Sequence, residues 1–187
     1  MVKTASNMLA LGTCAPHFYL EDVASGKMIS LGKKEHPKAT LIMFICNHCP
    51  YVKHANKGIV ALAKDYQPKG VRFIAINSND IEQYPEDSPQ HMQQVAKETG
   101  YIFPYLFDKT QEVAKAYHAA CTPDFFLFDK KLALVYRGQL DDSRPGNDIP
   151  ITGESIRTAL DCLLLSKPLP TLQKPSLGCN IKWKITK

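Results

Sequence analysis

Residues 40–50 read Thr-Leu-Ile-Met-Phe-Ile-Cys-Asn-His-Cys-Pro. The first part of this stretch, residues 40–45, is an almost continuous apolar run, which is typical of a strand buried on both faces. After Pro50, apolar side chains recur at helical spacing until residues 68–70 end the pattern with proline and glycine. The stretch therefore predicts a buried strand that leads into a helix, with two cysteines at the junction.

The rest of the chain alternates strand and helix patterns. A hairpin signature covers residues 15–31, where Ser25-Gly26 turns the chain. The further expected elements are a buried strand at 71–77, a helix from Ser88-Pro89 to Gly100, a short strand at 105–107, a helix over 111–119, strands at 125–128 and 132–136, and a helix that Thr152 begins. Strands that alternate with helices predict an α/β fold whose mixed central sheet carries helices on both faces.

Length and charge limit the classes of protein that this chain can represent. Its 187 residues suit one domain of about 150 residues with short extensions. The formal net charge is +5, but residues 1–161 carry 18 acidic and 18 basic side chains, so the excess comes from five lysines in the last 26 residues. A nucleic-acid-binding fold would carry a basic stripe over its body. We therefore expect a basic tail on a neutral domain and no nucleic-acid partner.

Membrane association and secretion are not expected either. No segment approaches the ~20 apolar residues of a membrane span. The N-terminus lacks the run of about 7–15 apolar residues found in a cleavable signal. Six cysteines are too few for a disulfide scaffold and, in a reducing compartment, are more often buried, catalytic or metal-bound. We therefore expect a cytoplasmic protein.

The Cys46-Asn47-His48-Cys49-Pro50 motif is the sharpest chemical signal. A thiol at the start of a helix faces free backbone N–H groups and the positive end of the helix dipole, and both favour the thiolate. We therefore expect a lowered pKa for Cys46, lowered further if His48 is protonated. Cys46 is then expected to attack a disulfide, and Cys49, about one turn on, to resolve it. Pro50 suits the first helical turn, where a missing N–H costs little.

Two other interpretations of the motif stay open. A Cys-x-x-Cys pair forms half of many zinc sites, although no second pair and no His-x₃-His follows in this chain. Alternatively, the two cysteines are buried core residues. Separately from the cysteines, His48 is either an electrostatic partner of Cys46 or an exposed spectator.

Three segments together resemble the thioredoxin superfamily, namely residues 15–18, residues 46–50 and Thr122-Pro123. They are more closely similar to redoxin-domain proteins of the AhpC/TSA and TlpA/ResA type, over about residues 10–166. The resemblance implies a thioredoxin-like fold that performs thiol–disulfide exchange on the two cysteines of the motif.

The resemblance also implies that the peptide bond before Pro123 is cis and that this proline faces the cysteine pair. The backbone of Thr122 would then be open to pair with an extended substrate segment. Cys121 is either a buried residue at a strand end or a third redox thiol. Cys14 and Cys162 are expected to be structural.

Several positions depart from the patterns of these families. Thioredoxins usually carry tryptophan before the first cysteine, where this chain has Ile45, and a buried acid in the preceding strand, where residues 41–45 supply none. The peroxiredoxin pattern Pro-x-x-x-Thr-x-x-Cys falls on Ala39, Met43 and Cys46, so both residues that orient peroxide are missing. A thiol peroxidase with antioxidant activity is therefore the weaker hypothesis.

The tail contains one more candidate thiol. Cys179, Ile181, Trp183 and Ile185 share one parity, and polar residues take the other between residues 180 and 184. This period predicts a half-buried strand that docks on the domain. Cys179 would then either reach the cysteine pair, as an alternative disulfide partner or relay, or be a buried thiol in a docking strand.

The sequence thus predicts a thioredoxin-like redoxin domain over residues 1–166, with an N-terminal hairpin, and a C-terminal extension over residues 167–187. The leading hypothesis is a thiol–disulfide oxidoreductase without bound cofactor or metal, whose partners are protein or small-molecule disulfides and an electron-donating thiol. The alternatives are a thiol peroxidase and a metal-binding module. The expected site residues are Cys46 and Cys49, supported by Asn47, His48, Pro50, Thr122 and Pro123, with Cys121 and Cys179 as further redox candidates.

Overall fold

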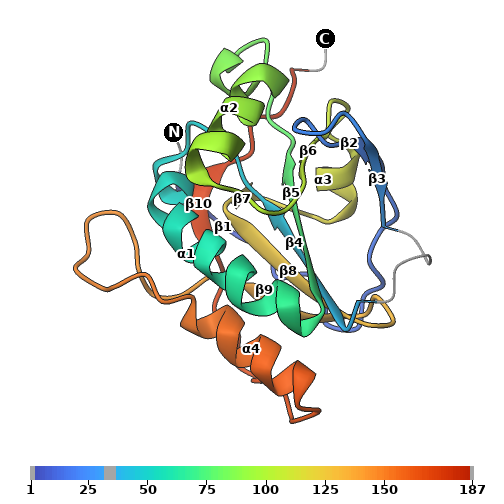
Figure 1. Ribbon diagram of the computed structural model, residues 1–187. Helices are drawn as coiled ribbons and strands as arrows, with labels where there is room; N and C mark the ends of the chain where they lie inside the picture. Colours follow the sequence, from blue (N-terminus) through green and yellow to red (C-terminus); the bar gives the residue numbers. More distant parts are fainter. Residues whose placement is uncertain (1–2, 32–36, 186–187) are drawn as a thin grey trace.

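A five-stranded mixed sheet forms the centre of the protein in the computed structural model, which describes residues 3–31 and 37–185 (Figure 1). Its strands are β4 (Ala39–Phe44), β5 (Val71–Asn77), β6 (Tyr105–Phe107), β8 (Asp124–Asp129) and β9 (Leu134–Gly138). They lie in the order β6-β5-β4-β8-β9. β4, β5 and β6 are parallel, whereas β8 runs antiparallel to β4, and β9 antiparallel to β8.

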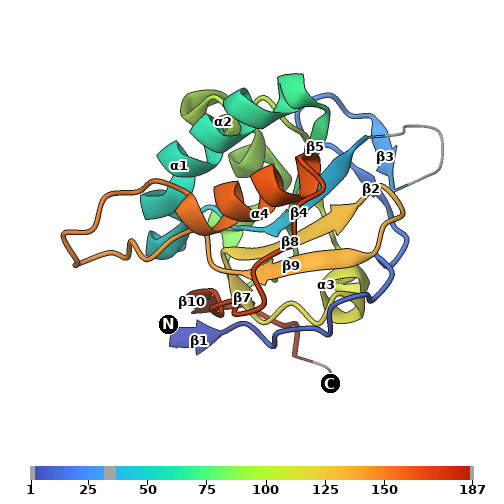
Figure 2. The same ribbon diagram turned by 90° about the horizontal axis from the view of Figure 1, so that it is seen from below.

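Helices cover both faces of this sheet. One face carries α1 (Pro50–Tyr66), α2 (Pro89–Thr99) and α4 (Glu154–Leu164), as Figure 2 shows. The other face carries α3 (Glu112–Ala116) and the hairpin of β2 (Tyr19–Glu21) and β3 (Met28–Ser30). Two short 3₁₀ helices are η1 (Gln67–Lys69) and η2 (Pro85–Asp87). The predicted mixed α/β architecture is therefore confirmed.

The central strand β4 divides the core into two layers. All six of its residues are buried, in agreement with the apolar run in the sequence. Leu41 and Met43 face the layer under α1, whereas Ile42 and Phe44 face the opposite layer, which contains Tyr117. Each fully buried aliphatic side chain contributes about 1.5–3 kcal/mol, so this strand anchors the segment that follows it.

A second, three-stranded sheet joins the two ends of the chain. It contains β1 (Lys3–Ala5), β10 (Leu177–Asn180) and β7 (Cys121–Thr122), in the order β1-β10-β7. All pairs are antiparallel, and Cys179 lies opposite Thr122. The C-terminal strand therefore lies directly beside the residues that precede Pro123. Neither β1 nor β7 was expected as a strand from the sequence.

The predicted alternation of the tail holds only in part. Cys179 and Ile181 are buried, but Trp183 is 39% exposed and Ile185 is 76% exposed. Lys182, expected on the solvent side, is buried. The strand ends at Asn180 because the chain then leaves β7 and the backbone N–H of Lys182 bonds to the Asn79 side chain at 2.8 Å.

Some helix ends and cysteine environments also differ from expectation. α3 covers five residues rather than 111–119, and its N-cap is Gln111 in a left-handed conformation (φ 65°). Gly153 rather than Thr152 caps α4. Cys14 is exposed. Cys162 is only partly buried, because α4 packs on the sheet through other residues. Neither cysteine is therefore a core residue.

Within residues 3–31 and 37–185, no helix has both the length and the apolar character needed to cross a bilayer.

Candidate active site

The Cys-x-x-Cys motif lies in the turn between β4 and α1. Cys46 follows the strand by two residues, and Cys49 is the N-cap of α1, with Pro50 at its first turn. Both thiols are buried, at 2% and 0% exposure. The helix thus begins at the second cysteine of the pair, whereas the sequence analysis placed the first cysteine at this end.

Thr122 and Pro123 face this pair from β7. The Thr122–Pro123 peptide bond is cis, as expected. The Thr122 hydroxyl lies 3.2 Å from the Cys46 sulfur, and its carbonyl oxygen lies 3.1 Å from the Cys49 sulfur. One residue therefore contacts both thiols, through its side chain and its backbone.

The edge of Thr122 is not open for a substrate, which corrects the expectation from the sequence. β10 pairs with β7 at this position, with Cys179 opposite Thr122. The Ser176 hydroxyl also donates to the carbonyl of Pro123 at 2.6 Å. The C-terminal segment of the chain therefore occupies the place that an extended partner was expected to take.

Cys179 joins the two thiols of the motif. Its sulfur lies 2.9 Å from the sulfur of Cys49, although 130 residues separate the two along the chain. All six cysteines, which lie in the described ranges, are in the reduced form. The site therefore contains three neighbouring thiols rather than two.

The pKa values of the two thiols of the motif are shifted in opposite directions. Burial raises the pKa of Cys46 well above its ordinary value, and the neighbouring Cys49 and the Asp87 carboxylate add to the shift. Hydrogen bonding from Cys46 lowers the pKa of Cys49 to about 5 against the opposing effect of burial, and contacts with Cys179 and the Val52 amide act in the same direction. The surroundings thus favour the protonated form of Cys46 over that of Cys49.

The pKa of Cys46 is thus shifted in the opposite direction to the lowering expected from the sequence, for two reasons. First, the N-terminus of α1 is at Cys49, so its free N–H groups favour charge on that sulfur. Second, His48 does not act alone, because the carboxylate of Asp87 accompanies it.

Asp87 lies outside the cysteine motif but contacts two of its residues, Asn47 and His48. Its Oδ2 lies 2.6 Å from Nδ1 of His48, and its Oδ1 accepts the backbone N–H of Asn47 at 2.7 Å. The Asn79 side chain donates to Oδ2 at 2.8 Å. Although burial alone would raise it, the pKa of Asp87 is lowered, chiefly by the hydrogen bond with His48. Asp87 was not among the predicted site residues; it directly precedes Ser88, where the sequence predicts the start of a helix.

A second buried acid lies next to the cis-proline. Asp124 begins β8 and pairs in register with Phe44, the last residue of β4. It is fully buried, and this burial raises its pKa to about 8. The sequence offered no acid in residues 41–45, and the structure instead brings Asp87 and Asp124 to this end of the sheet from other segments.

Cys121 is separated from the other thiols by the geometry of its strand. Neighbouring residues of a strand point to opposite faces, and Thr122 takes the face toward Cys46. The Cys121 sulfur lies 3.7 Å from the carbonyl oxygen of Pro123, and burial raises its pKa strongly. This environment favours the interpretation of a buried structural thiol.

Ligand atoms that suit a metal ion also converge here. One atom each of Cys46, His48 and Asp87 lies within 4.8 Å of the other two. However, His48 and Asp87 already bond to each other through Nδ1 and Oδ2, which leaves the buried Nε2 of His48 without a protein partner. These three residues are the set that would hold an ion.

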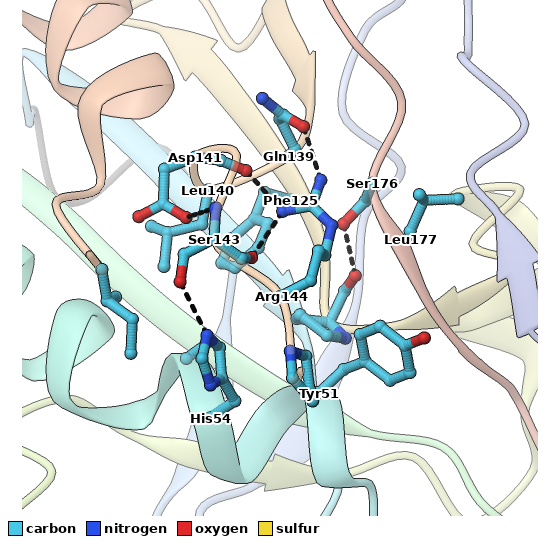
Figure 3. A pocket seen from close by; sticks show the side chains of 14 residues that line it. Tyr51, His54, Phe125, Gln139, Leu140, Asp141, Ser143, Arg144, Ser176 and Leu177 are labelled. Carbon is cyan, nitrogen blue, oxygen red and sulfur yellow. Dashed lines mark hydrogen bonds between the residues drawn. The ribbon is translucent and has the colours of Figure 1, made fainter. Parts of the chain in front are cut away.

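A small pocket lies on the other side of the cis-proline (Figure 3). Its lining includes Pro123, Tyr51 and Arg144, and a hydrogen bond of 2.7 Å between His54 and Ser143 ties the neighbouring loop to α1. The cavity measures about 20 Å³, which is room for about one water molecule. This pocket is therefore too small to hold a substrate.

A cysteine pair that faces a cis-proline at the end of a mixed sheet defines a thioredoxin-like protein. The model of the AhpC/TSA family matches residues 11–137. The chain therefore belongs to the AhpC/TSA family.

Several solved structures share this fold. An uncharacterized conserved protein from Geobacillus kaustophilus is 62% identical, with a TM-score of 0.97 over 100% of this chain and 99% of that one. A hypothetical protein from Sinorhizobium meliloti 1021 is 46% identical, with a TM-score of 0.95 over 98% and 100%. A putative thiol:disulfide interchange protein DsbE from Chlorobium tepidum shares the fold at 17% identity, with a TM-score of 0.66 over 83% and 99%. No curated protein matches.

Proposed function

We propose that this member of the AhpC/TSA family is a thiol–disulfide oxidoreductase that works through Cys46 and Cys49. The observation that carries the proposal is the contact of Thr122 with both sulfurs, at 3.2 Å and 3.1 Å, beside a cis-proline. A pair of core cysteines would not need a neighbouring hydroxyl, a shared proton and an adjacent buried acid.

Cys46 is proposed to be the thiol that attacks the partner disulfide. Cys49 is enclosed by the Thr122 carbonyl and by Cys179, whereas the Thr122 hydroxyl can donate to Cys46 and lower its pKa. The pair is proposed to share one proton, which Cys49 accepts from Cys46 as a partner disulfide approaches; the opposite pKa shifts of the two thiols support this sharing. The two thiols thus supply both a nucleophile and its base.

The proposed reaction proceeds in two exchanges. Cys46 attacks one sulfur of the partner disulfide, and the other partner sulfur leaves with the electron pair and takes up the proton held by Cys49. The Cys49 thiolate then attacks Cys46, which releases the second partner sulfur as a thiolate. The partner is reduced by two electrons, and the Cys46–Cys49 disulfide forms. An electron-donating thiol, in a reducing compartment such as the cytoplasm, is proposed to return the pair to the reduced form.

The remaining site residues are proposed to position this pair. Asn47 and His48 are held by Asp87, Pro50 begins α1, and Thr122 and Pro123 form the facing surface. Residues 167–187 are proposed as a basic extension that completes the site through β10 rather than as an independent arm.

The test is disulfide reduction with insulin and with oxidised glutathione, in the presence of dithiothreitol. Cys46→Ser and Cys49→Ser are expected to lose the activity, and Cys162→Ser on α4 is the matched control that keeps it. A Cys46→Ser protein that reduces both disulfides at the wild-type rate would contradict the proposal.

The same preparations address the two alternatives. A peroxidase would consume hydrogen peroxide through Cys46, although Ala39 and Met43 replace the residues that orient peroxide and burial raises the pKa of the thiol. A metal-binding module would hold an ion at Cys46, His48 and Asp87. Peroxide consumption without disulfide reduction, or stoichiometric zinc in the reduced protein that blocks alkylation of Cys46, would replace the proposed function.

A further inference from the structure

We propose that Cys179 is a third redox thiol of this site, which takes over the disulfide by attacking Cys49 of the oxidised Cys46–Cys49 pair. The inference rests on the proposed exchange activity of that pair and assigns it an internal exchange partner. The protein then has two oxidised forms, one with a Cys46–Cys49 bridge and one with a Cys49–Cys179 bridge.

The sulfur atoms of Cys49 and Cys179 already lie close together. The sulfur atoms of Cys49 and Cys179 lie 2.9 Å apart, and a disulfide bond is about 2.05 Å long. The two atoms therefore need to approach by only about 1 Å to form a bond.

The three-stranded sheet holds Cys179 in one place. β10 lies between β1 and β7, with Cys179 in register with both Lys3 and Thr122. Gly178 passes so close to β7 that a Cβ atom there would lie 2.0 Å from the carbonyl oxygen of Thr122. The thiol of Cys179 is thus delivered to Cys49 by backbone pairing and not by a mobile arm.

β10 occupies the position that was expected for an extended substrate segment. Thr122 is the residue whose backbone was expected to pair with an extended substrate, and β10 pairs with it instead. The chain therefore presents its own cysteine, on its own strand, at the place where an extended substrate segment was expected. Exchange with Cys179 is the same chemistry as exchange with a partner, made intramolecular.

The internal step is balanced without any added oxidant. Cys179 gives up its proton, and its thiolate attacks the Cys49 sulfur, so that the Cys49–Cys179 bond forms and the Cys46–Cys49 bond breaks. The electron pair leaves on Cys46, which takes the proton. The Thr122 hydroxyl, 3.2 Å from Cys46, stabilises the leaving thiolate. No net oxidation occurs, and Cys46 is again a thiol while the protein stays oxidised.

The test is disulfide mapping of Cys46→Ser, in which Cys49 and Cys179 are the remaining neighbouring thiols. After one equivalent of diamide and an acid quench, we expect an intramolecular Cys49–Cys179 bridge in most molecules by peptide mass spectrometry. Cys46→Ser combined with Cys179→Ser should lack it, and Cys46→Ser combined with Cys162→Ser is the matched control that should keep it.

Two negative outcomes separate the inference from the proposed function. If wild type forms the Cys46–Cys49 bridge but Cys46→Ser forms only intermolecular products, the Cys179 relay is overturned and the proposed function stands. If neither Cys46 nor Cys49 is bridged in wild type or in Cys179→Ser, the proposed function itself fails.

A second measurement follows the two bridges in time. After rapid oxidation of the wild type, the Cys46–Cys49 bridge should appear first and then decline as the Cys49–Cys179 bridge increases, while their sum stays constant. A Cys49–Cys179 bridge that appears as early as the Cys46–Cys49 bridge, with no later decline of the latter, would show that the bridges form independently and would overturn the internal exchange.

Discussion

Nδ1 of His48 lies 2.6 Å from Oδ2 of Asp87, and this contact joins the cysteine motif to a segment 39 residues away. The Asp87 side chain is completely buried, whereas that of His48 is 12% exposed. The positive charge that a histidine could bring to Cys46 is therefore accompanied by a negative one. The carboxylate also fixes the turn, since it accepts the backbone N–H of Asn47.

The first prediction concerns the charge of Asp87. Because this carboxylate raises the pKa of Cys46, Asp87→Asn should lower that pKa. The midpoint of Cys46 alkylation against pH, followed by peptide mass spectrometry, should move to lower pH. The loss of hydrogen bonds that involve a buried charge should also reduce the free energy of unfolding by about 1–3 kcal/mol.

The matched control for this variant is Asp142→Asn. Asp142 pairs with Lys174 at 2.8 Å on the surface, and both side chains are more than half exposed. It should leave the alkylation midpoint of Cys46 unchanged. A midpoint that Asp87→Asn leaves in place, or raises, would contradict the electrostatic role of this residue.

The second prediction concerns the location of the thiolate. Thiolate absorbance at 240 nm should show one transition near pH 5 in wild type, because the pKa of Cys49 is lowered to about 5, chiefly by the hydrogen bond from Cys46. Cys46→Ala removes that donor and should move the transition to higher pH. Cys46→Ser keeps an O–H donor and should move it less, and Cys49→Ser should abolish it.

A wild-type titration without a transition between about pH 4 and pH 7 would show that Cys49 does not carry the charge. Cys162→Ser, which alters a thiol on the far helix α4, should retain the acidic transition unchanged.

The third prediction concerns Asp124 and the pH dependence of stability. Burial raises the pKa of Asp124 to about 8, above its ordinary value of 3.8. Between these values the folded protein keeps a proton that the unfolded chain has lost, so this residue's contribution to stability falls as pH rises toward 8 and is then constant. Asp124→Asn removes this dependence.

Urea denaturation at pH 5, 6, 7, 8 and 9 measures the effect. The stability of Asp124→Asn relative to wild type should rise steadily up to about pH 8 and level off above it. A difference that is constant over this range would mean that Asp124 is ionised in the folded protein.

The fourth prediction concerns the close approach of β10 to β7. Gly178→Ala would place a Cβ atom 2.0 Å from the Thr122 carbonyl oxygen, so the two strands must separate. Amide exchange in residues 177–180 should become faster, and bridging of Cys49 to Cys179 should decrease. The control is Gly146→Ala, where a Cβ meets nothing within 4 Å and only the positive φ of 87° adds a cost of about 1–2 kcal/mol.

Protection of β10 that is the same in Gly178→Ala and in wild type would contradict the tight pairing. Loss of protection in Gly146→Ala, where an added Cβ meets no atom within 4 Å, would show that the effect is a general loss of stability.

The sequence by itself determined the layered fold and the chemical nature of the motif. The apolar run of residues 40–45, the proline and glycine signals at helix ends and the spacing of Cys46 and Cys49 are local patterns, and local patterns follow directly from residue order. The parity of Cys179 and Ile181 likewise indicated a strand near the C-terminus, although the prediction extended too far, to Trp183 and Ile185.

The tertiary structure alone decided where charge and reactivity lie. Asp87 reaches His48 across 39 residues and Cys179 reaches Cys49 across 130, and no local pattern records such pairings. The pKa of each thiol depends on burial and on neighbours that only the packed chain brings together, which is why the pKa of Cys46, expected to be lowered, is raised and that of Cys49 is lowered.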